Sequence, residues 1–313
     1  MSPTILVAGA TGNTGRNTVA TLSKLLAGGA LPGHRVLALT RSSKSPAAQQ
    51  LAALPGVEVL EKNWTDITSA WLRDHQVVRA FIASHNDPRQ FPEESSFHLA
   101  ALHAGVQYVV RISTTATNVR PDCPAYYARQ HWAIEALLDT SEFAALQWTS
   151  LQPNVFTTFA LQPAAELIKE YRKTGKQHTL RLTNSADALV GAIDPDDVGA
   201  VAATLLCLDD PAPHNKARYV LNGPEDVTGE QIVALVEQYI GTRVEEVVYK
   251  DMSFVDQWAA AVPETASLIA TIKCAAETGW AGKCSASTTS KEILELAAPK
   301  RTAADVLKAM LEQ

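Results

Sequence analysis

The residues that most clearly indicate chemistry form a glycine-rich turn near the start of the chain, Gly9-Ala10-Thr11-Gly12-Asn13-Thr14-Gly15-Arg16. Glycines let a backbone approach a pyrophosphate closely, and a helix that begins at such a turn offers free N–H groups and the positive end of its dipole. A tight turn without a ligand is the alternative, but an apolar run precedes these glycines and a helical pattern follows them, as a dinucleotide site requires. The expected contacts are Gly9, Thr11, Gly12, Asn13, Thr14 and Gly15.

The polar segment Thr40-Arg41-Ser42-Ser43-Lys44 predicts which dinucleotide is bound. A site for NAD usually carries an acidic residue about 20 residues past the glycines, where it bonds the ribose 2′-hydroxyl. This segment has no acid; Arg41 can clamp a 2′-phosphate, Lys44 adds charge and Ser42 adds a donor. Unless the segment is only a solvated basic loop, it favours NADP(H). Asp66, after a third apolar run, either faces the adenine or caps the following helix.

Short apolar runs that alternate with helical patterns would position these residues. We expect strands at residues 4–8, 36–40, 57–60, 80–84, 108–112 and 146–151. We expect helices at residues 17–26, 46–54, 70–75, 95–104 and 125–138. Strands joined by crossover helices form a parallel sheet, so the predicted fold is α/β, a doubly wound parallel sheet of the Rossmann type.

The pattern changes after Pro153. Helices at residues 156–173, 196–208 and 229–240 are interspersed with short strands at 219–222 and 244–249, and the remainder is mostly helical. We therefore predict an NADP-binding Rossmann domain at residues 1–152 and a smaller C-terminal α+β lobe at residues 153–313 that binds substrate, although strands of this second part could return to the first sheet.

Composition excludes several classes of protein. The 313 residues are 46% hydrophobic and 19% charged, which is typical of a folded globular chain. A net charge of −6 without a basic stripe argues against nucleic-acid binding. The four cysteines form no CxxC pair and have no histidines at zinc-ligand spacing, so we predict reduced thiols and no metal site. Every apolar run is shorter than the ~20 residues of a membrane span. We expect a cytoplasmic protein.

Four features in this order resemble the NmrA-like atypical short-chain dehydrogenases/reductases, which are relatives of the isoflavone reductases. They are the turn Gly9–Arg16, the basic residue Arg41, the run Asp194–Val198 before an alanine-rich helix, and the stretch Tyr219–Gly223, which Asp226–Thr228 and another helix follow. The resemblance covers roughly residues 3 to 250. It implies a Rossmann domain that binds NADP(H) and a smaller substrate lobe, in a family that contains both reductases and nucleotide-sensing regulators.

The resemblance also implies where catalysis would occur. In short-chain dehydrogenases a Tyr-xxx-Lys pair on the helix after the fifth strand supplies the proton donor. Here that helix carries Tyr127 and, four residues later on the same face, His131, where NmrA-like members commonly have lysine. A neutral histidine lowers the pKa of a phenol less than a lysine cation does. Tyr127 would stay protonated as a donor, with His131 as base or shuttle; alternatively, Tyr127 packs internally and His131 pairs with Glu135 on an exposed face.

Other contacts implied by the resemblance follow the later strands. Hydroxyls after the fifth strand would orient the substrate, or else cap loop N–H groups. Residues after the fourth strand would lie beside the cofactor ribose, and those after the sixth would line the nicotinamide. The candidates after the fifth strand are Ser113 and Thr115, and those after the fourth strand are Ser84, His85 and Asn86. The candidates after the sixth strand are Gln152, Pro153, Asn154 and Phe156.

The sequence thus predicts an oxidoreductase: an NADPH-dependent reductase of a small, partly apolar organic substrate, with a weaker similarity to members from secondary metabolism. Two other functions stay open. One is a cofactor-retaining cyclase or isomerase that uses Tyr127 and His131 for acid–base chemistry, and the other is a non-catalytic NADP-sensing regulator. We expect neither a nucleic acid nor a membrane as partner, and the oligomeric state is left open.

Overall fold

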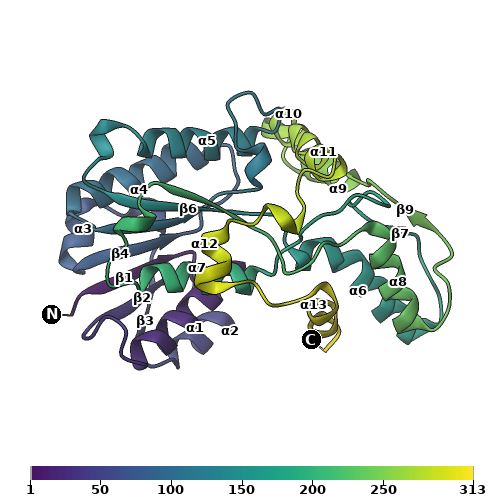
Figure 1. The fold of residues 1–313 in the computed structure, drawn as a ribbon, viewed down its shortest axis with the longest axis horizontal. Coiled ribbons are helices and arrows are strands. Elements are labelled where there is room, and N and C mark those ends of the chain that lie inside the picture. Colours follow the sequence, from purple (N-terminus) through teal and green to yellow (C-terminus); the bar gives the residue numbers. More distant parts are fainter. Residues whose placement is uncertain (1, 313) are drawn as a thin grey trace.

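A seven-stranded sheet, in which all neighbouring strands are parallel, forms the centre of the larger part of the protein (Figure 1). The computed structural model describes residues 2–312. In sheet order the strands are β3 (Val57–Glu61), β2 (Arg35–Thr40), β1 (Thr4–Ala8), β4 (Val77–Ile82), β5 (Tyr108–Ile112), β6 (Gln147–Pro153) and β8 (Ala217–Leu221). This arrangement confirms the predicted doubly wound parallel fold.

Helices cover both faces of this sheet, and the central strand β1 is apolar on both sides. In β1, Ile5 and Val7 belong to one apolar cluster, and Leu6 and Ala8 belong to the other. The first cluster contains residues of α1 (Asn13–Ala27), α2 (Pro46–Ala52), α7 (Pro195–Leu206) and α12 (Lys291–Ala297). The second contains residues of α3 (Ser69–Asp74), α4 (Gln90–Ala104) and α5 (Tyr126–Leu138).

A smaller lobe has its own apolar core. That core joins α6 (Thr157–Thr174), α8 (Gly229–Ile240) and α13 (Ala303–Glu312), and it includes β7 (Leu180–Arg181), which pairs in parallel with β9 (Val247–Val248). The short helices α9 (Ser253–Ala261), α10 (Ala266–Ala270) and α11 (Glu277–Trp280) extend from this lobe toward α5 (Figure 1). The backbone N–H of Tyr126 donates to the Thr271 hydroxyl, and Asn118 donates to the Ala275 carbonyl, so these helices are attached to both parts of the molecule.

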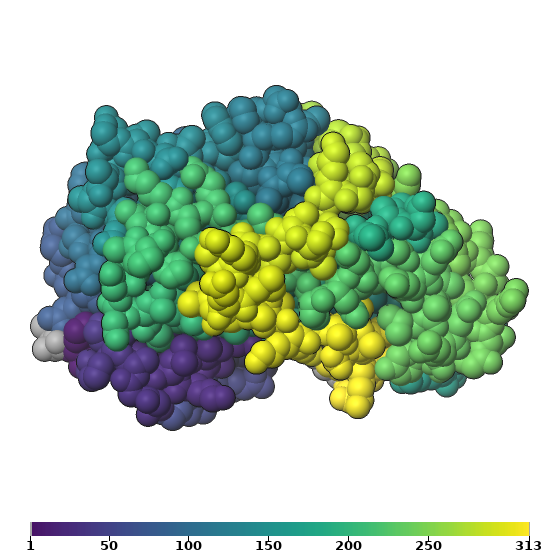
Figure 2. All heavy atoms as spheres, viewed as in Figure 1, coloured from purple at the N-terminus to yellow at the C-terminus, as the bar shows by residue number. Residues whose placement is uncertain are grey.

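The chain crosses between the two parts more than once. After α6 and β7 it returns to the main sheet as α7 and β8, and α7 packs directly against α1. In Figure 2 the yellow C-terminal segment lies across the face between the larger part and the smaller lobe. There the Arg301 guanidinium pairs with Asp194 at 2.6 Å and Asp196 at 3.1 Å, both at the start of α7. Residues 195–221 therefore lie against the sheet of the predicted first domain, and the boundary at residue 152 stays a prediction.

Several elements begin earlier than the apolar pattern indicates, among them α1, which begins at Asn13 rather than at Asn17. Strand β4 begins at Val77 because the buried Arg79, which interrupts the apolar run, is satisfied by the Leu206 and Leu208 carbonyls at 2.7 and 2.5 Å. Helix α4 begins at Gln90 rather than near Ser95, since Pro92 lies in the first turn, where a missing N–H costs nothing.

Candidate functional site

The glycine-rich turn leaves β1 at the point where the strand order reverses, between β1 and β4. Gly9 has a φ of +85°, and a Cβ on Gly15 would lie 2.1 Å from the Gly9 carbonyl oxygen, so both positions require glycine. Helix α1 begins after Gly12, with neither a side-chain cap nor an acidic residue in its first turn. Its first N–H groups and its dipole are therefore free to bind an anion.

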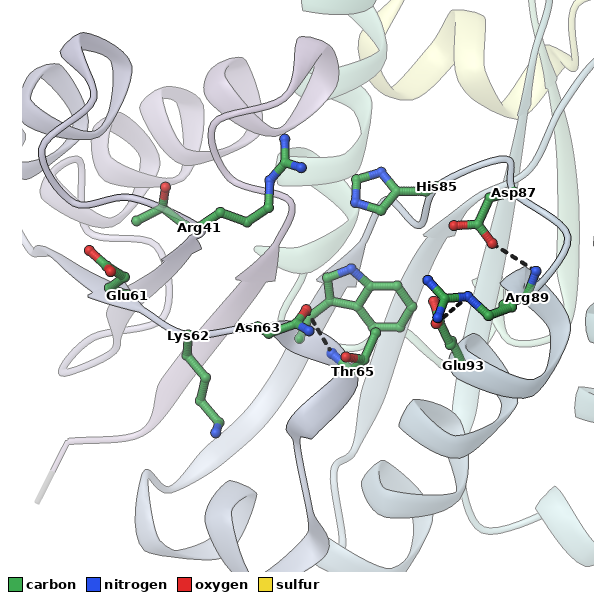
Figure 3. Close-up of a pocket in the computed structure, with 11 residues that line it drawn as sticks. Arg41, Glu61, Lys62, Asn63, Thr65, His85, Asp87, Arg89 and Glu93 are labelled. Atoms are coloured by element: carbon green, nitrogen blue, oxygen red, sulfur yellow. Dashed lines mark hydrogen bonds and ion pairs between the residues drawn. The ribbon is translucent and has the colours of Figure 1, made fainter. Parts of the chain in front are cut away.

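A pocket of about 580 Å³ lies at the ends of β2, β3 and β4 (Figure 3), and its lining includes no residue of the glycine-rich turn. Arg41 reaches into it, and within residues 2–312 the guanidinium has no ion pair. Figure 3 shows His85 opposite Arg41, with Asn63 and Thr65 on the wall between them. The complete lining is Thr40, Arg41, Glu61, Lys62, Asn63, Trp64, Thr65, His85, Asp87, Arg89 and Glu93.

The other predicted phosphate contacts lie outside the lining. Ser42 and Lys44 are exposed in the loop after β2, and the Ser42 carbonyl accepts from the Thr40 and Ser45 hydroxyls. Asp66 is exposed in a short 3₁₀ turn after β3. The pocket is lined instead by Lys62, Asn63 and Thr65. These residues were not predicted, although Asp66 of the same segment was. The sequence feature that could have indicated them is the run of polar residues directly after β3.

The loop between β4 and α4 contributes to the pocket through His85 rather than Ser84 or Asn86. The Ser84 hydroxyl points inward and donates to Glu94 at 2.5 Å. Asn86 lies against α5, where its carbonyl accepts from the Tyr126 hydroxyl at 2.7 Å. His85 and Arg89 are exposed in the pocket, and the half-buried Asp87 lines it beside them. Asp87 and Arg89 were not predicted, although they follow the predicted segment Ser84–Asn86 directly.

Tyr127 and His131 lie on the same side of α5, with ring centroids 6.4 Å apart and planes at 88°. His131 is buried, and the Arg111 guanidinium donates to its Nδ1 at 2.9 Å. Because an arginine cannot accept, this Nδ1 carries no proton, and Nε2–H donates to the Asn86 side-chain oxygen at 3.0 Å. Burial, together with the Arg111 charge, lowers the pKa of His131 to about 3. The ring is therefore neutral at physiological pH.

Tyr127 is placed differently, at the end of α5 that faces the smaller lobe. It packs with Cys123, Ala125, Ala128 and Ala275. Burial raises the pKa of its phenol, and the interaction with the Thr114 side chain offsets only part of that shift. The phenol stays protonated at neutral pH and is able to donate a hydrogen bond or a proton.

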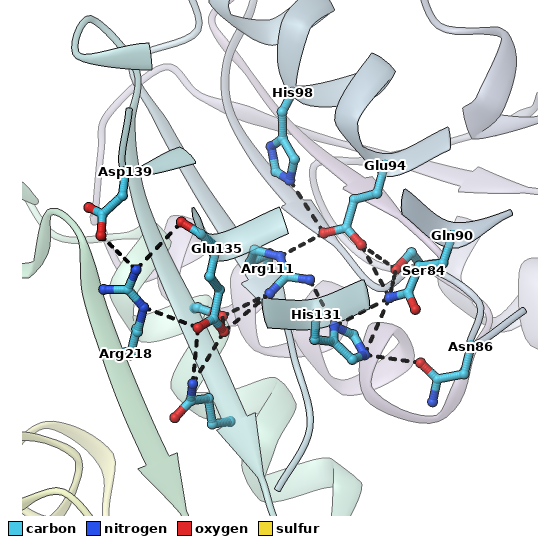
Figure 4. A network of polar contacts seen from close by, with 12 residues as sticks. Ser84, Asn86, Gln90, Glu94, His98, Arg111, His131, Glu135, Asp139 and Arg218 are labelled. Carbon is cyan, nitrogen blue, oxygen red and sulfur yellow. Dashed lines mark hydrogen bonds and ion pairs between the residues drawn. The ribbon is translucent and has the colours of Figure 1, made fainter. Parts of the chain in front are cut away.

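A buried charge network lies behind His131 (Figure 4). Arg111 donates to the Glu94 carboxylate at 2.6 Å and lies 3.4 Å from the Glu135 carboxylate, and all three side chains are almost fully buried. Arg218 pairs with Glu135 at 3.0 Å from the other side. Asp139 pairs with Arg218 at 2.8 Å and with Lys216 at 3.7 Å, so three carboxylates and three cationic side chains balance when the histidines beside them are neutral. Burial lowers the pKa of His98, and Arg111 lowers it further.

The residues predicted to orient the substrate after β5 and to line the nicotinamide after β6 are mostly engaged with the protein. The Gln152 amide donates to both Glu135 oxygens at 3.2 Å. The Asn154 amide donates to Gly191, Asn222 and Cys284, and the Thr115 hydroxyl contacts the Asn154 oxygen at 3.5 Å. Pro153 ends β6 and Phe156 precedes α6. Ser113 differs, because its buried hydroxyl has no partner within the described residues.

Two other kinds of site are absent from residues 2–312. No group of three potential ligands is placed to hold a metal ion. In the same residues no helix combines the length and the apolar character needed to cross a membrane.

These features define a class: a Rossmann-type α/β protein with an anion-binding turn at its switch point and a smaller lobe beside the carboxyl ends of the strands. The chain belongs to the NmrA-like family, whose model matches residues 1–302. A comparison with curated protein sequences finds no match.

Solved structures share the whole fold. The NADPH-dependent quinone oxidoreductase of Escherichia coli, complexed with NADPH, is 21% identical with a TM-score of 0.71 over 98% of this chain and 99% of that one. The Citrobacter sp. triphenylmethane reductase, complexed with NADP(H), is 22% identical with a TM-score of 0.70 over 98% and 100%. NmrA, a negative transcriptional regulator in complex with NADP, is 16% identical with a TM-score of 0.65 over 99% and 91%.

Proposed function

We propose that this chain is an NADP(H)-dependent reductase of a small, partly apolar organic substrate. The observation that carries the proposal is Arg41, whose guanidinium has no ion pair within residues 2–312. It lies in the pocket after β2, on the same edge of the sheet as the uncapped start of α1. An anion at each place would satisfy both groups, which matches the pyrophosphate and 2′-phosphate of NADP(H). The similar structures complexed with NADPH or NADP support this choice.

The chain's own residues divide the remaining tasks. Bound NADPH would supply the hydride. Tyr127 keeps its proton at neutral pH and is our candidate for the group that donates it to the substrate. The unpartnered Ser113 hydroxyl is the candidate for orienting the substrate.

The proposed apolar character of the substrate has a matching surface on the smaller lobe. Phe159, in the first turn of α6, is 43% exposed and packs edge-to-face on Phe254 of α9, with 5.5 Å between the ring centroids. Trp258, one turn further along α9, is 41% exposed. Exposed aromatic side chains close to the end of β6 suit an apolar substrate.

We place the protein in the cytoplasm, because all four cysteines are free thiols in the structure. A role in secondary metabolism rests on the family resemblance alone.

The first test is binding and turnover of NADPH. Gly12→Val would place a branched side chain over the start of α1, with its Cβ 3.2 Å from the Gly9 carbonyl. Titration by NADPH fluorescence should show a loss of affinity of more than 100-fold, while circular dichroism shows an intact fold. Unchanged NADPH affinity in a folded Gly12→Val protein would sink the proposal.

A non-catalytic NADP-binding regulator is the second candidate. The observation that favours it is His131, whose two ring nitrogens are both engaged by protein groups, on the helix where reductases place a lysine. A small quinone with NADPH separates the candidates through the absorbance of NADPH. Oxidation supports the reductase, conversion of the substrate without oxidation supports a cyclase or isomerase, and NADPH binding without any turnover supports the regulator.

A further inference from the structure

Three side chains of helix α5 form hydrogen bonds to the loop between β4 and α4. The Tyr126 hydroxyl donates to the Asn86 carbonyl at 2.7 Å, and the Gln130 amide donates to the Asp87 carbonyl at 2.8 Å. His131 Nε2–H donates to the Asn86 side chain at 3.0 Å. The loop, residues 84–89, is otherwise a run of exposed and half-buried residues without regular structure. Its position therefore depends on α5.

The same loop forms one wall of the pocket that contains Arg41. His85, Asp87 and Arg89 all line it, and two of them are immediate neighbours of Asn86. Figure 3 shows His85 across the pocket from Arg41. A displacement of Asn86 would therefore move the wall that faces the proposed 2′-phosphate site.

On its other side, His131 is held by buried polar groups. Arg111 donates to Nδ1 at 2.9 Å, and Arg111 is itself held by Glu94 at 2.6 Å and by the Ser150 hydroxyl at 3.0 Å (Figure 4). The Gln90 amide lies 3.3 Å from both ring nitrogens. The imidazole thus connects a rigid buried network in the sheet to a surface loop, with one tautomer imposed by Arg111.

We propose that His131 is a positioning residue that sets the β4–α4 loop for nucleotide binding, and that it carries no proton in the reaction. This inference rests on the proposed binding of NADP(H). Both ring nitrogens are occupied by protein partners, so neither is available to a substrate. A lysine, which the family resemblance leads one to expect, would not perform this task, because an ammonium has no lone pair to accept from Arg111.

The test compares variants at both ends of the contact. His131→Leu removes both hydrogen bonds, and Asn86→Leu removes the acceptor on an exposed loop residue, where folding is not at risk. His131→Gln keeps a neutral side chain with one acceptor and one donor. His103→Leu, at an exposed histidine in the last turn of α4, is the matched control.

Two readouts are needed. The first is amide hydrogen exchange at residues 85–89 without any nucleotide, and the second is the dissociation constant for NADPH. We expect His131→Leu and Asn86→Leu to speed exchange in the loop about ten-fold and to weaken NADPH binding about three- to ten-fold. His131→Gln should restore both to within about two-fold of the original protein, and His103→Leu should change neither.

Each contrary result has a distinct meaning. If exchange in the loop is unchanged in both leucine variants, the positioning role is wrong. If His131→Gln binds NADPH normally but loses more than 100-fold in turnover, His131 carries a proton and the inference is overturned. If the original protein binds no NADPH, the proposed function fails, while the exchange data still decide whether His131 positions the loop.

Discussion

Arg41 is the residue on which the choice of cofactor depends. Its guanidinium enters the pocket without an acidic partner in the described part of the chain, so a 2′-phosphate would gain a charged, bidentate contact there. Arg41→Ala should weaken NADPH binding by roughly 10- to 150-fold, from about 1.5–3 kcal/mol, and leave NADH binding almost unchanged. Calorimetric titration of both nucleotides measures the difference. Arg243→Ala, at an exposed arginine of the smaller lobe, is the control; equal losses for the two nucleotides would contradict the assignment.

Tyr127 is the residue to which we assign proton donation. Tyr127→Phe removes only the hydroxyl, and turnover with NADPH and a small quinone should fall ~10²–10⁴-fold with NADPH affinity kept within about two-fold. Because burial raises the pKa of the phenol, the activity of the original protein should show no loss from its ionisation at neutral pH. Tyr239→Phe, at a partly buried tyrosine that packs against the core of the smaller lobe, controls for the loss of a hydroxyl. Near-normal turnover in Tyr127→Phe would shift attention to Ser113.

At the scale of elements, the position of α1 depends on α7. A Cβ on Gly199 of α7 would lie 2.6 Å from the Thr14 carbonyl and 2.8 Å from the Thr18 nitrogen, so the two backbones are in contact at this point. Thr14 belongs to the first turn of α1, which is the proposed pyrophosphate site. The second part of the chain therefore helps to build the binding site of the first.

Gly199→Val should push α1 away from the sheet. We expect a loss of about 1–3 kcal/mol in the free energy of unfolding, measured with urea, and a weaker affinity for NADPH in the same variant. Gly279→Ala is the matched control, since its Cβ would only reach ordinary contact with Val190 at 3.7 Å. If the free energy of unfolding of Gly199→Val is unchanged, the close contact between α1 and α7 does not contribute to stability, and this prediction is wrong.

Most elements were predictable because their signals are local. Strand β1 is a continuous apolar run that ends at Gly9, and the capping residues Asp194 and Thr228 precede α7 and α8 as expected of N-caps. The exceptions are elements whose polar residues are satisfied by distant parts of the chain. Arg79 in β4 is such a residue, since its partners are carbonyls 127 and 129 positions away.

At the scale of the molecule, the candidate site was likewise predictable only where its residues do not depend on distant parts of the chain. The glycine turn and Arg41 follow their strands directly, so their neighbourhood could be predicted from order alone. His131 could not, because its environment is made by Arg111 of β5, Glu94 of α4 and Asn86 of a loop, which meet only when the sheet forms. An exposed pairing of His131 with Glu135 was the predicted alternative, whereas both side chains are buried and both bind Arg111.

This buried network makes the stability of the whole molecule depend on pH. His131, with a pKa of about 3, and His98, whose pKa is also lowered by burial, stay neutral in the folded protein. In the unfolded chain a histidine takes up a proton near pH 6.5. Below that pH the unfolded state binds protons that the folded state does not bind, so the free energy of unfolding falls as pH falls. Above about pH 7 these histidines contribute no pH dependence to the free energy of unfolding. Although burial alone would raise the pKa of Glu94, Arg111 and His98 keep it low, which adds a further loss below pH 4.5.

Urea unfolding at pH 7.5, 6.0 and 5.0 measures this dependence. Each neutral histidine contributes a slope of at most about 1.4 kcal/mol per pH unit between pH 6 and its folded pKa. His131→Gln should reduce the slope by about that amount, because glutamine takes up no proton in either state. His103→Gln, at an exposed position, should leave the slope as it is. If the free energy of unfolding is the same at pH 7.5 and pH 5.0, the two buried histidines take up protons in the folded protein as they do in the unfolded chain. The neutral state assigned to them beside Arg111, Glu94 and Glu135 is then wrong.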